Sequence, residues 1–211
     1  MKNKKIGIID FNLNNLESVK AACKHAKIDF KVINNKDDII KCDGLILPGV
    51  GTFGAAIKNL KKQKIFEILK IALKKKPTLA ICLGMQLLLD QSEESKGIKG
   101  LGIIKGKCKR FKKKFKVPHT GWSSVKIVKQ DKIFKNISKK SVFYFVHSYY
   151  VDILNKNITT SVTDYENFKF VSSFNHRNIF GLQFHPEKSS NTGLLIYKNF
   201  KNFVNSYEDT F

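Results

Sequence analysis

The stretch TLAICLGMQ at residues 78–86 decides the fold that we expect of this chain. Its first four residues suit a buried strand, and helix-forming residues follow Gly84. A sharp turn from strand to helix lifts the residue at the turn out of the sheet, and aims the next backbone N–H groups at an incoming carbonyl. Cys82 stands at that turn. We therefore predict a nucleophilic thiol here; the alternative is a buried cysteine that ends a core strand.

Strand and helix patterns alternate in the first half of the chain, up to and including this turn. Apolar strand candidates lie at 5–10, 31–33, 44–48 and 78–82, and helical spacing lies at 19–26 and 65–72. Strands separated by helices of this length predict a parallel sheet, in which ligands bind beyond the carboxyl ends of the strands. The loops 11–15, 48–54 and 82–86 all follow such strands.

The second half of the chain has a different pattern of expected secondary structure. From about residue 98 it is β-rich, with strand candidates at 123–128, 141–153, 158–165, 169–174 and 178–184, followed by a helix capped by Ser189 or Ser190. The sequence therefore predicts one α/β domain over residues 1–211. We expect a flavodoxin-like domain whose central, mostly parallel sheet is flanked by helices and carries a β-rich antiparallel extension.

The composition of the chain argues against a membrane-spanning, a secreted or a disulfide-rich protein. The chain has 211 residues, of which 42% are hydrophobic, and no apolar run is long enough to cross a membrane. The N-terminus lacks the apolar region of a secretory signal. Four scattered cysteines form no CxxC pair, so we expect a cytoplasmic protein with no metal site, no cofactor and no disulfide framework. Cys23 lies on the apolar side of a predicted helix and is expected to be buried.

The net charge of +22 raises the possibility of nucleic-acid binding. Only two of the basic residues are arginines, and the lysines are spread along the whole chain. Arginine is the residue that reads bases and phosphates in bidentate fashion, so we expect no nucleic-acid partner. The densest run, KCKRFKKKFK at 107–116, also fits a solvated strand with Phe111 and Phe115 facing inward.

A second motif, FHPE at residues 184–187, supplies an imidazole and a carboxylate. On an extended segment His185 and Glu187 point to the same face. We predict that His185 is the general base for Cys82 and that Glu187 orients it; the alternative is an ordinary surface turn. His147 is a rival base without a nearby carboxylate, and the other histidines are expected to be exposed or structural.

The PGVG segment at residues 48–51 is a candidate oxyanion-stabilising loop. Gly49 and Gly51 flank Val50, so the peptide groups here can rotate at little cost. Together with the amide of Leu83, such a loop can supply N–H donors to a developing oxyanion. The alternative is a plain turn after a strand.

Five segments together carry a resemblance to a known family. They are AICLGMQ, FHPEKSS, LPGVGTFG, PHTGW and YFVHSYY. With them the chain resembles the class I (triad-type) glutamine amidotransferases, and within that family the glutaminase subunits of imidazole glycerol phosphate synthase. The resemblance runs from about residue 5 to residue 200 and so covers nearly the whole chain.

The resemblance implies a function in histidine biosynthesis. Cys82 would attack the side-chain amide of glutamine, and the ammonia would pass to a (β/α)8-barrel cyclase subunit that is the partner in a heterodimer. In the family, glutamine is held at the positions of Gln86, Glu94, Ser148 and Tyr149, and the oxyanion loop matches Val50 and Gly51. The positions that dock the barrel match His119, Trp122, Tyr144 and Lys188.

The chain departs from the family pattern in three places. Ala80 stands where glycine is usual, Asn12 and Asn14 replace two glycines after the first strand, and PHTGWS replaces PHMGWN. Asparagine tolerates left-handed backbone best among the other residues, so the turn is expected to survive. Two alternatives remain open: a paralogous subunit that feeds ammonia to another synthetase, as in surface-sugar biosynthesis, and a basic binding module without catalysis.

Overall fold

The structure is a computed structural model that describes residues 4–13 and 15–208. The helices are α1 (Leu16–His25), α2 (Lys36–Lys41), α3 (Phe53–Lys62), α4 (Phe66–Lys75), α5 (Leu83–Leu87) and α6 (Ser190–Ser206), with short 3-10 turns η1 (Lys132–Phe134), η2 (Lys156–Ile158) and η3 (Pro186–Lys188). The strands are β1 (Ile6–Ile9), β2 (Phe30–Ile33), β3 (Gly44–Leu47), β4 (Thr78–Ile81), β5 (Leu89–Ser92), β6 (Ile104–Arg110), β7 (His119–Ile127), β8 (Lys140–His147), β9 (Tyr149–Ile153), β10 (Thr159–Tyr165), β11 (Phe168–His176) and β12 (Ile179–Leu182).

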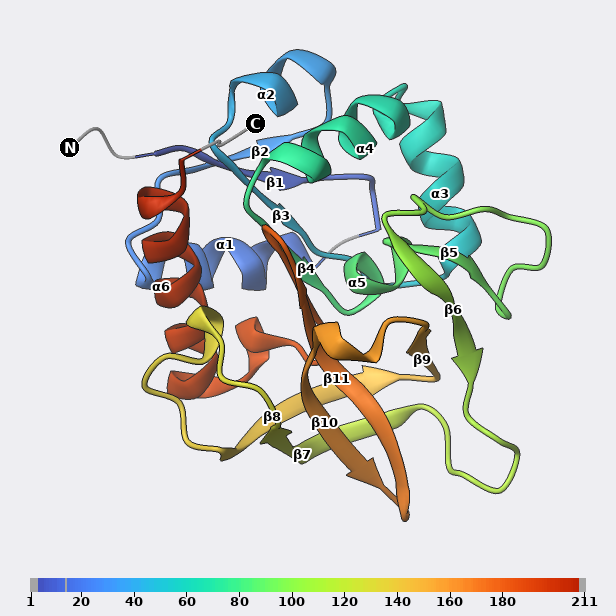
Figure 1. Ribbon diagram of the computed structural model, residues 1–211. Coiled ribbons are helices and arrows are strands. Elements are labelled where there is room, and N and C mark those ends of the chain that lie inside the picture. The colour runs from blue at the N-terminus through green and yellow to red at the C-terminus, as the bar shows by residue number, and fades with distance from the viewer. Residues whose placement is uncertain (1–3, 14, 209–211) are drawn as a thin grey trace.

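A large mixed sheet organises the molecule (Figure 1). Its nine strands run in the order β2-β1-β3-β4-β12-β11-β10-β7-β8. The first five are parallel, and the remaining strands pair antiparallel. The parallel order is that of the flavodoxin-like doubly wound fold. The predicted fold class, a helix-flanked parallel sheet with an antiparallel extension, is confirmed.

Helices cover both faces of the parallel strands because successive side chains of a strand point to opposite faces. In β3, Leu45 and Leu47 are buried in the core under α2, α3 and α4, whereas Ile46 is buried in the core under α1 and α6. Figure 1 shows α1 and α6 on one side of these strands and α3 and α4 on the other. Cys23, on the core-facing side of α1, is fully buried, as predicted.

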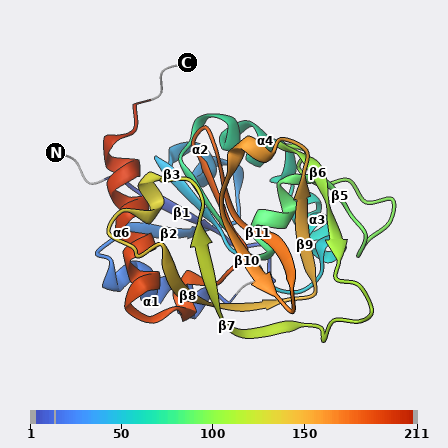
Figure 2. The same cartoon turned by 60° about the horizontal axis from the view of Figure 1, so that its bottom comes forward.

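A second sheet has three strands in the order β5-β6-β9 and shares no strand with the large one (Figure 2). It corrects the expectation of one continuous β stretch over 141–153. The chain leaves the large sheet at the end of β8, and Ser148 joins it to β9 in the small sheet. The basic run is also corrected in part: β6 ends at Arg110, but Phe111 and Phe115 are buried as expected.

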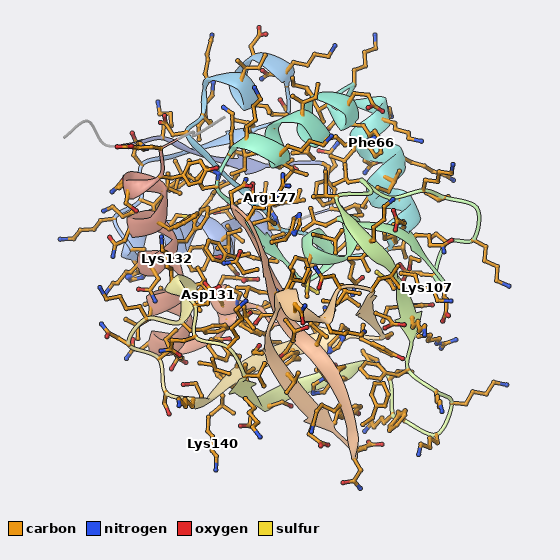
Figure 3. The ribbon with its side chains drawn as sticks, viewed as in Figure 1. Phe66, Lys107, Asp131, Lys132, Lys140 and Arg177 are labelled. Atoms are coloured by element: carbon orange, nitrogen blue, oxygen red, sulfur yellow. The ribbon has the colours of Figure 1, made fainter. Side chains whose placement is uncertain are left out.

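The lysines that give the chain its charge lie on separate elements. Lys107, Lys132 and Lys140 belong to β6, η1 and β8, and the side chain of Lys140 extends away from the molecule in Figure 3. Within the described residues, no helix has the length and apolar character needed to cross a membrane. Asn12 adopts the left-handed backbone expected for it, with φ of 63°, while Asn14 lies outside the described residues.

Candidate active site

Cys82 occupies a strained turn between β4 and α5. Its backbone has φ of 50° and ψ of −107°, and its amide donates to the carbonyl of Leu182 at 2.7 Å. A positive φ is costly for a residue with a Cβ, so the surrounding packing must hold it. Gly84 permits that packing, because a Cβ there would lie 1.8 Å from the carbonyl oxygen of Leu47. The turn therefore presents a thiol just beyond the carboxyl end of a central parallel strand.

His185 and Glu187 form a buried pair at the start of η3. The Nδ1 atom of His185 lies 2.7 Å from Oε1 of Glu187, and both side chains are almost fully buried. Burial lowers the pKa of His185, but the neighbouring Cys82 and then Glu187 outweigh it and raise that pKa to about 10. The Nε2 atom makes no aligned hydrogen bond to any described residue. Glu187 holds the imidazole through Nδ1, and the imidazole favours its protonated form, so His185 is suited to exchange a proton with the thiol of Cys82.

A pocket of about 260 Å³ opens over this thiol. Its wall brings together residues from both halves of the sequence, namely Val50, Gly51, Cys82, Leu83, Gln86, Glu94, Pro118, Val146, His147, Ser148, Tyr149 and His185. The residues expected at the oxyanion loop and around a glutamine therefore all line this pocket. Glu187 lies behind His185 and is absent from the wall.

The amide of Val50 and the carboxylate of Glu94, both on the pocket wall, already have partners inside the protein. The amide of Val50 donates to the carbonyl of Leu13 at 2.9 Å. One carboxylate oxygen of Glu94 accepts from the amide of Phe53 at 2.6 Å, at the first residue of α3. Gly51 has φ of 92°, a conformation that suits glycine. The loop is thus ordered in a state in which the amide of Val50 points to Leu13.

Three of the four expected docking residues gather on an accessible surface. Trp122 and Tyr144 face each other across β7 and β8, with ring centroids 6.1 Å apart, and the ammonium of Lys188 lies 5.6 Å from the Tyr144 ring. Trp122 is 53% exposed, which is unusual for tryptophan. His119 is different: its imidazole is buried, so this side chain does not reach the surface that the others form.

His147, the rival base, is engaged elsewhere. Its Nδ1 lies 2.8 Å from the carbonyl oxygen of Tyr149, and its Nε2 lies 3.0 Å from Nδ1 of His119. Burial lowers the pKa of His147 to about 3 and that of His119 to about 4. Both nitrogens of His147 are thus occupied, and the geometry favours His185 as the base.

The sequence analysis missed Gln183, whose Nε2 lies 3.6 Å from the sulfur of Cys82. The signal for it is strand register. Leu182 pairs with Ile81 in the parallel β12–β4 ladder, so the residues that follow, Gln183 and Cys82, leave the sheet side by side. Recognising this requires knowing that these two strands are neighbours.

Comparison with known proteins agrees with this geometry. The family model for class-I glutamine amidotransferases matches residues 7–203. Imidazole glycerol phosphate synthase subunit HisH of Methanocaldococcus jannaschii is 49% identical over 197 residues, covering 92% of this chain and 97% of that protein. Subunit HisH 1 of Campylobacter jejuni is 45% identical over 200 residues, covering 92% of this chain and 98% of its own length.

Solved structures share the fold at low sequence identity. A putative GMP synthase component from Thermoplasma acidophilum superposes with a TM-score of 0.74 at 19% identity, covering 98% of this chain and 96% of that one. PurLQS from Thermotoga maritima gives a TM-score of 0.75 at 17% identity, with 96% and 99% covered. The chain belongs to the class I glutamine amidotransferase family.

Proposed function

We propose that the chain is the glutaminase subunit of an imidazole glycerol phosphate synthase. It would hydrolyse glutamine to glutamate and ammonia, and deliver the ammonia to a (β/α)8-barrel cyclase in histidine biosynthesis. The observation that carries the proposal is the pocket in which the strained Cys82 meets His185, itself held by Glu187 at 2.7 Å. The identity with HisH subunits over nearly the full length supports this choice of synthase. The reaction would take place in the cytoplasm.

The triad would work through a thioester. The Cys82 thiolate attacks the side-chain carbonyl carbon of glutamine, and the carbonyl electrons move to oxygen. The imidazolium of His185 gives its proton to the departing nitrogen, so that ammonia leaves and the γ-glutamyl thioester forms. Water then attacks the thioester with His185 as base, releasing glutamate and the thiol. Glu187 keeps the imidazole oriented and stabilises its cationic form throughout.

The pocket wall would hold glutamine and its oxyanion. The amide of Leu83, at the start of α5, and the Val50–Gly51 segment would supply the N–H donors for the oxyanion. Glu94 would attract the amino group of glutamine, and Gln86 with the backbone at Ser148 and Tyr149 would hold the rest of its α-carbon end. All of these residues line the same pocket as Cys82.

The cyclase would dock on the surface formed by Trp122, Tyr144 and Lys188. Tryptophan and tyrosine are enriched among the residues that contribute most of the binding energy at protein interfaces. Trp122→Ala is expected to weaken binding of the cyclase in a titration followed by calorimetry. Val128→Ala is the matched control, since this apolar residue is also about half exposed and lies just after β7.

The decisive experiment measures glutamate release by the chain mixed with a histidine cyclase and its ribonucleotide ligand. Wild-type protein should turn over glutamine, and Cys82→Ala should not, with an unchanged circular dichroism spectrum. Cys23→Ala is the control, because this cysteine is buried on the core-facing side of α1 and does not line the pocket. Glutamine turnover by Cys82→Ala, or no response to the cyclase, would contradict the proposal.

A further inference from the structure

A continuous hydrogen-bonded chain reaches the sulfur of Cys82, and the thiol itself donates to the carbonyl of Val146 at 3.9 Å. Gln183 Nε2 lies 3.6 Å from the sulfur of Cys82, and Gln183 Oε1 accepts from Gln86 Nε2 at 3.2 Å. The same Gln86 nitrogen donates to the carbonyl of Tyr149 at 3.0 Å. Gln183 is fully buried, and its backbone amide donates to the carbonyl of Ser172 at 2.9 Å. The side chain is therefore fixed at both ends.

The chain continues away from the pocket through two histidines. His147 Nδ1 lies 2.8 Å from the Tyr149 carbonyl, and His147 Nε2 lies 3.0 Å from Nδ1 of His119. His119 Nε2 in turn lies 2.8 Å from the hydroxyl of Ser123. These contacts link β7 to the sulfur through buried groups.

The Tyr149 carbonyl fixes the direction of every bond in this chain. A carbonyl oxygen only accepts, so both His147 Nδ1 and the contacting atom of Gln86 must be N–H donors. Burial lowers the pKa of His147 and of His119, so both rings are neutral at pH 7. In the neutral rings His147 Nε2 accepts, His119 Nδ1 donates, and the Ser123 hydroxyl donates to His119 Nε2. On the other branch, Gln86 donates to Gln183 Oε1, so the NH₂ group of Gln183 is the end that faces Cys82. The sulfur thus meets a donor that cannot reverse without breaking the chain.

We propose that Gln183 is a further catalytic residue, which donates a hydrogen bond to the Cys82 sulfur and stabilises its thiolate. Hydrogen bonds to an ionised acceptor are stronger than neutral ones, so this bond gains strength as the thiol loses its proton. The chain through Gln86 and the Tyr149 carbonyl positions the donor beforehand. This inference rests on the proposed function for its role in turnover, but its chemistry is confined to Cys82 and is measurable without glutamine.

The test is the pH dependence of Cys82 alkylation by iodoacetamide, followed by mass spectrometry on the isolated chain. Only the thiolate reacts, so the rate reports its population at each pH. Gln183→Met keeps the length and approximate volume of the side chain but removes the NH₂ group that donates to the sulfur. We expect its rise in alkylation to move to higher pH by about one unit, and its rate at pH 7 to fall about 10-fold. The other titratable groups on the pocket wall, His185, His147, Glu94 and Tyr149, are unchanged in this variant.

Two further variants keep the test decisive. Gln86→Met frees the Gln183 amide to turn, so it should shift the profile in the same direction by a smaller amount. Gln91→Met is the matched control, because this exposed glutamine lies on β5 outside the pocket and should leave the profile unchanged. If Gln183→Met does not fold, as judged by circular dichroism, Gln86→Met carries the test.

The outcomes separate this inference from the proposed function. A wild-type alkylation profile in folded Gln183→Met, or in Gln86→Met if the first variant does not fold, would overturn the role of Gln183. That result would stand whether or not the wild-type chain hydrolyses glutamine. Conversely, a shifted profile in a chain that never releases glutamate would support the hydrogen bond and count only against the proposed function.

Discussion

The amide of Val50 donates to the carbonyl of Leu13 across 2.9 Å, and this bond ties the PGVG loop to the segment that follows β1. An N–H group engaged in this way is not free to stabilise an oxyanion in the pocket. Completing the proposed oxyanion hole would require rotation of the Gly49–Val50 peptide group, which a preceding glycine permits. The bond therefore describes a resting state of the proposed enzyme, from which a partner would release the amide.

We predict that Val50→Pro abolishes stimulation of glutaminase activity by the liganded cyclase. Proline has no N–H, so the oxyanion loses a donor, and loss of one such donor costs about 10²- to 10³-fold in kcat. The measurement is glutamate release under saturating cyclase and glutamine.

Val50→Ala separates the amide from the side chain in this experiment. It keeps the N–H and should respond to the cyclase within about threefold of wild type, since a surface substitution of this kind costs little. Strong stimulation of the proline variant would show that the Val50 amide plays no part in the hole.

The sequence alone pointed to most of the residues around the thiol, but not to the hydrogen bonds that connect them. Cys82 and the His185–Glu187 pair stand in local motifs, where the turn and the two-residue spacing carry the information. The bond from Val50 to Leu13 depends on one peptide orientation, which glycine-rich sequence leaves undetermined. Gln183 reaches Cys82 only because β12 and β4 are neighbours, and these strands are far apart in sequence.

The break at Ser148 escaped prediction for a related reason. Both halves of 141–153 have strand-forming residues, and alternation does not say to which sheet each half belongs. The same break places the Tyr149 carbonyl between Gln86 and His147. Sequence patterns therefore could not predict the hydrogen bonds behind the pocket, although they did predict the parallel sheet.

Glu187→Gln should slow glutamine hydrolysis by about 10²- to 10⁴-fold, because the imidazole loses the negative charge that supports its protonated form. Burial lowers the pKa of His185, and Cys82 and Glu187 together raise it to about 10. Removing the Glu187 charge should therefore also move the alkaline limb of the pH–rate profile to lower pH.

Steady-state rates from pH 5 to pH 10 test both effects. Glu93→Gln is the control, since this carboxylate is next to Glu94 in sequence but is exposed and outside the pocket wall. A Glu187→Gln enzyme with wild-type rate and profile would show that another group orients His185.

The buried His119–His147 pair should make the fold sensitive to acid. Burial lowers the pKa of His119 from 6.5 to about 4 and that of His147 from 6.5 to about 3. In the unfolded chain both rings take up protons near their ordinary pKa, so between about pH 6.5 and pH 4 the unfolded state binds more protons. The free energy of unfolding should fall as the pH drops through this window, by at most about 1.4 kcal/mol per pH unit for each ring.

Urea denaturation at a series of pH values measures this slope. In His147→Gln the contribution of one ring is lost, so the slope between pH 6.5 and pH 4 should become shallower. His25→Gln is the matched control, because this histidine lies at the exposed end of α1. Equal slopes in wild type and His147→Gln would mean that the ring is protonated alike in both states.

Tyr197→Phe should raise the free energy of unfolding, by about 1 kcal/mol, because the Tyr197 hydroxyl is buried and has no hydrogen-bond partner among the described residues. The ring itself packs in the core between α6 and the sheet, and phenylalanine preserves that packing. Tyr165→Phe is the control: its hydroxyl donates to the carbonyl of Lys116 at 2.7 Å, so its removal should bring no such gain. Chemical denaturation of the three proteins at pH 7 makes the comparison. A Tyr197→Phe variant less stable than wild type would contradict this prediction, because it would mean that the hydroxyl has a hydrogen-bond partner in solution. The Glu187 carboxylate, whose charge helps to raise the pKa of Tyr197, would be that partner.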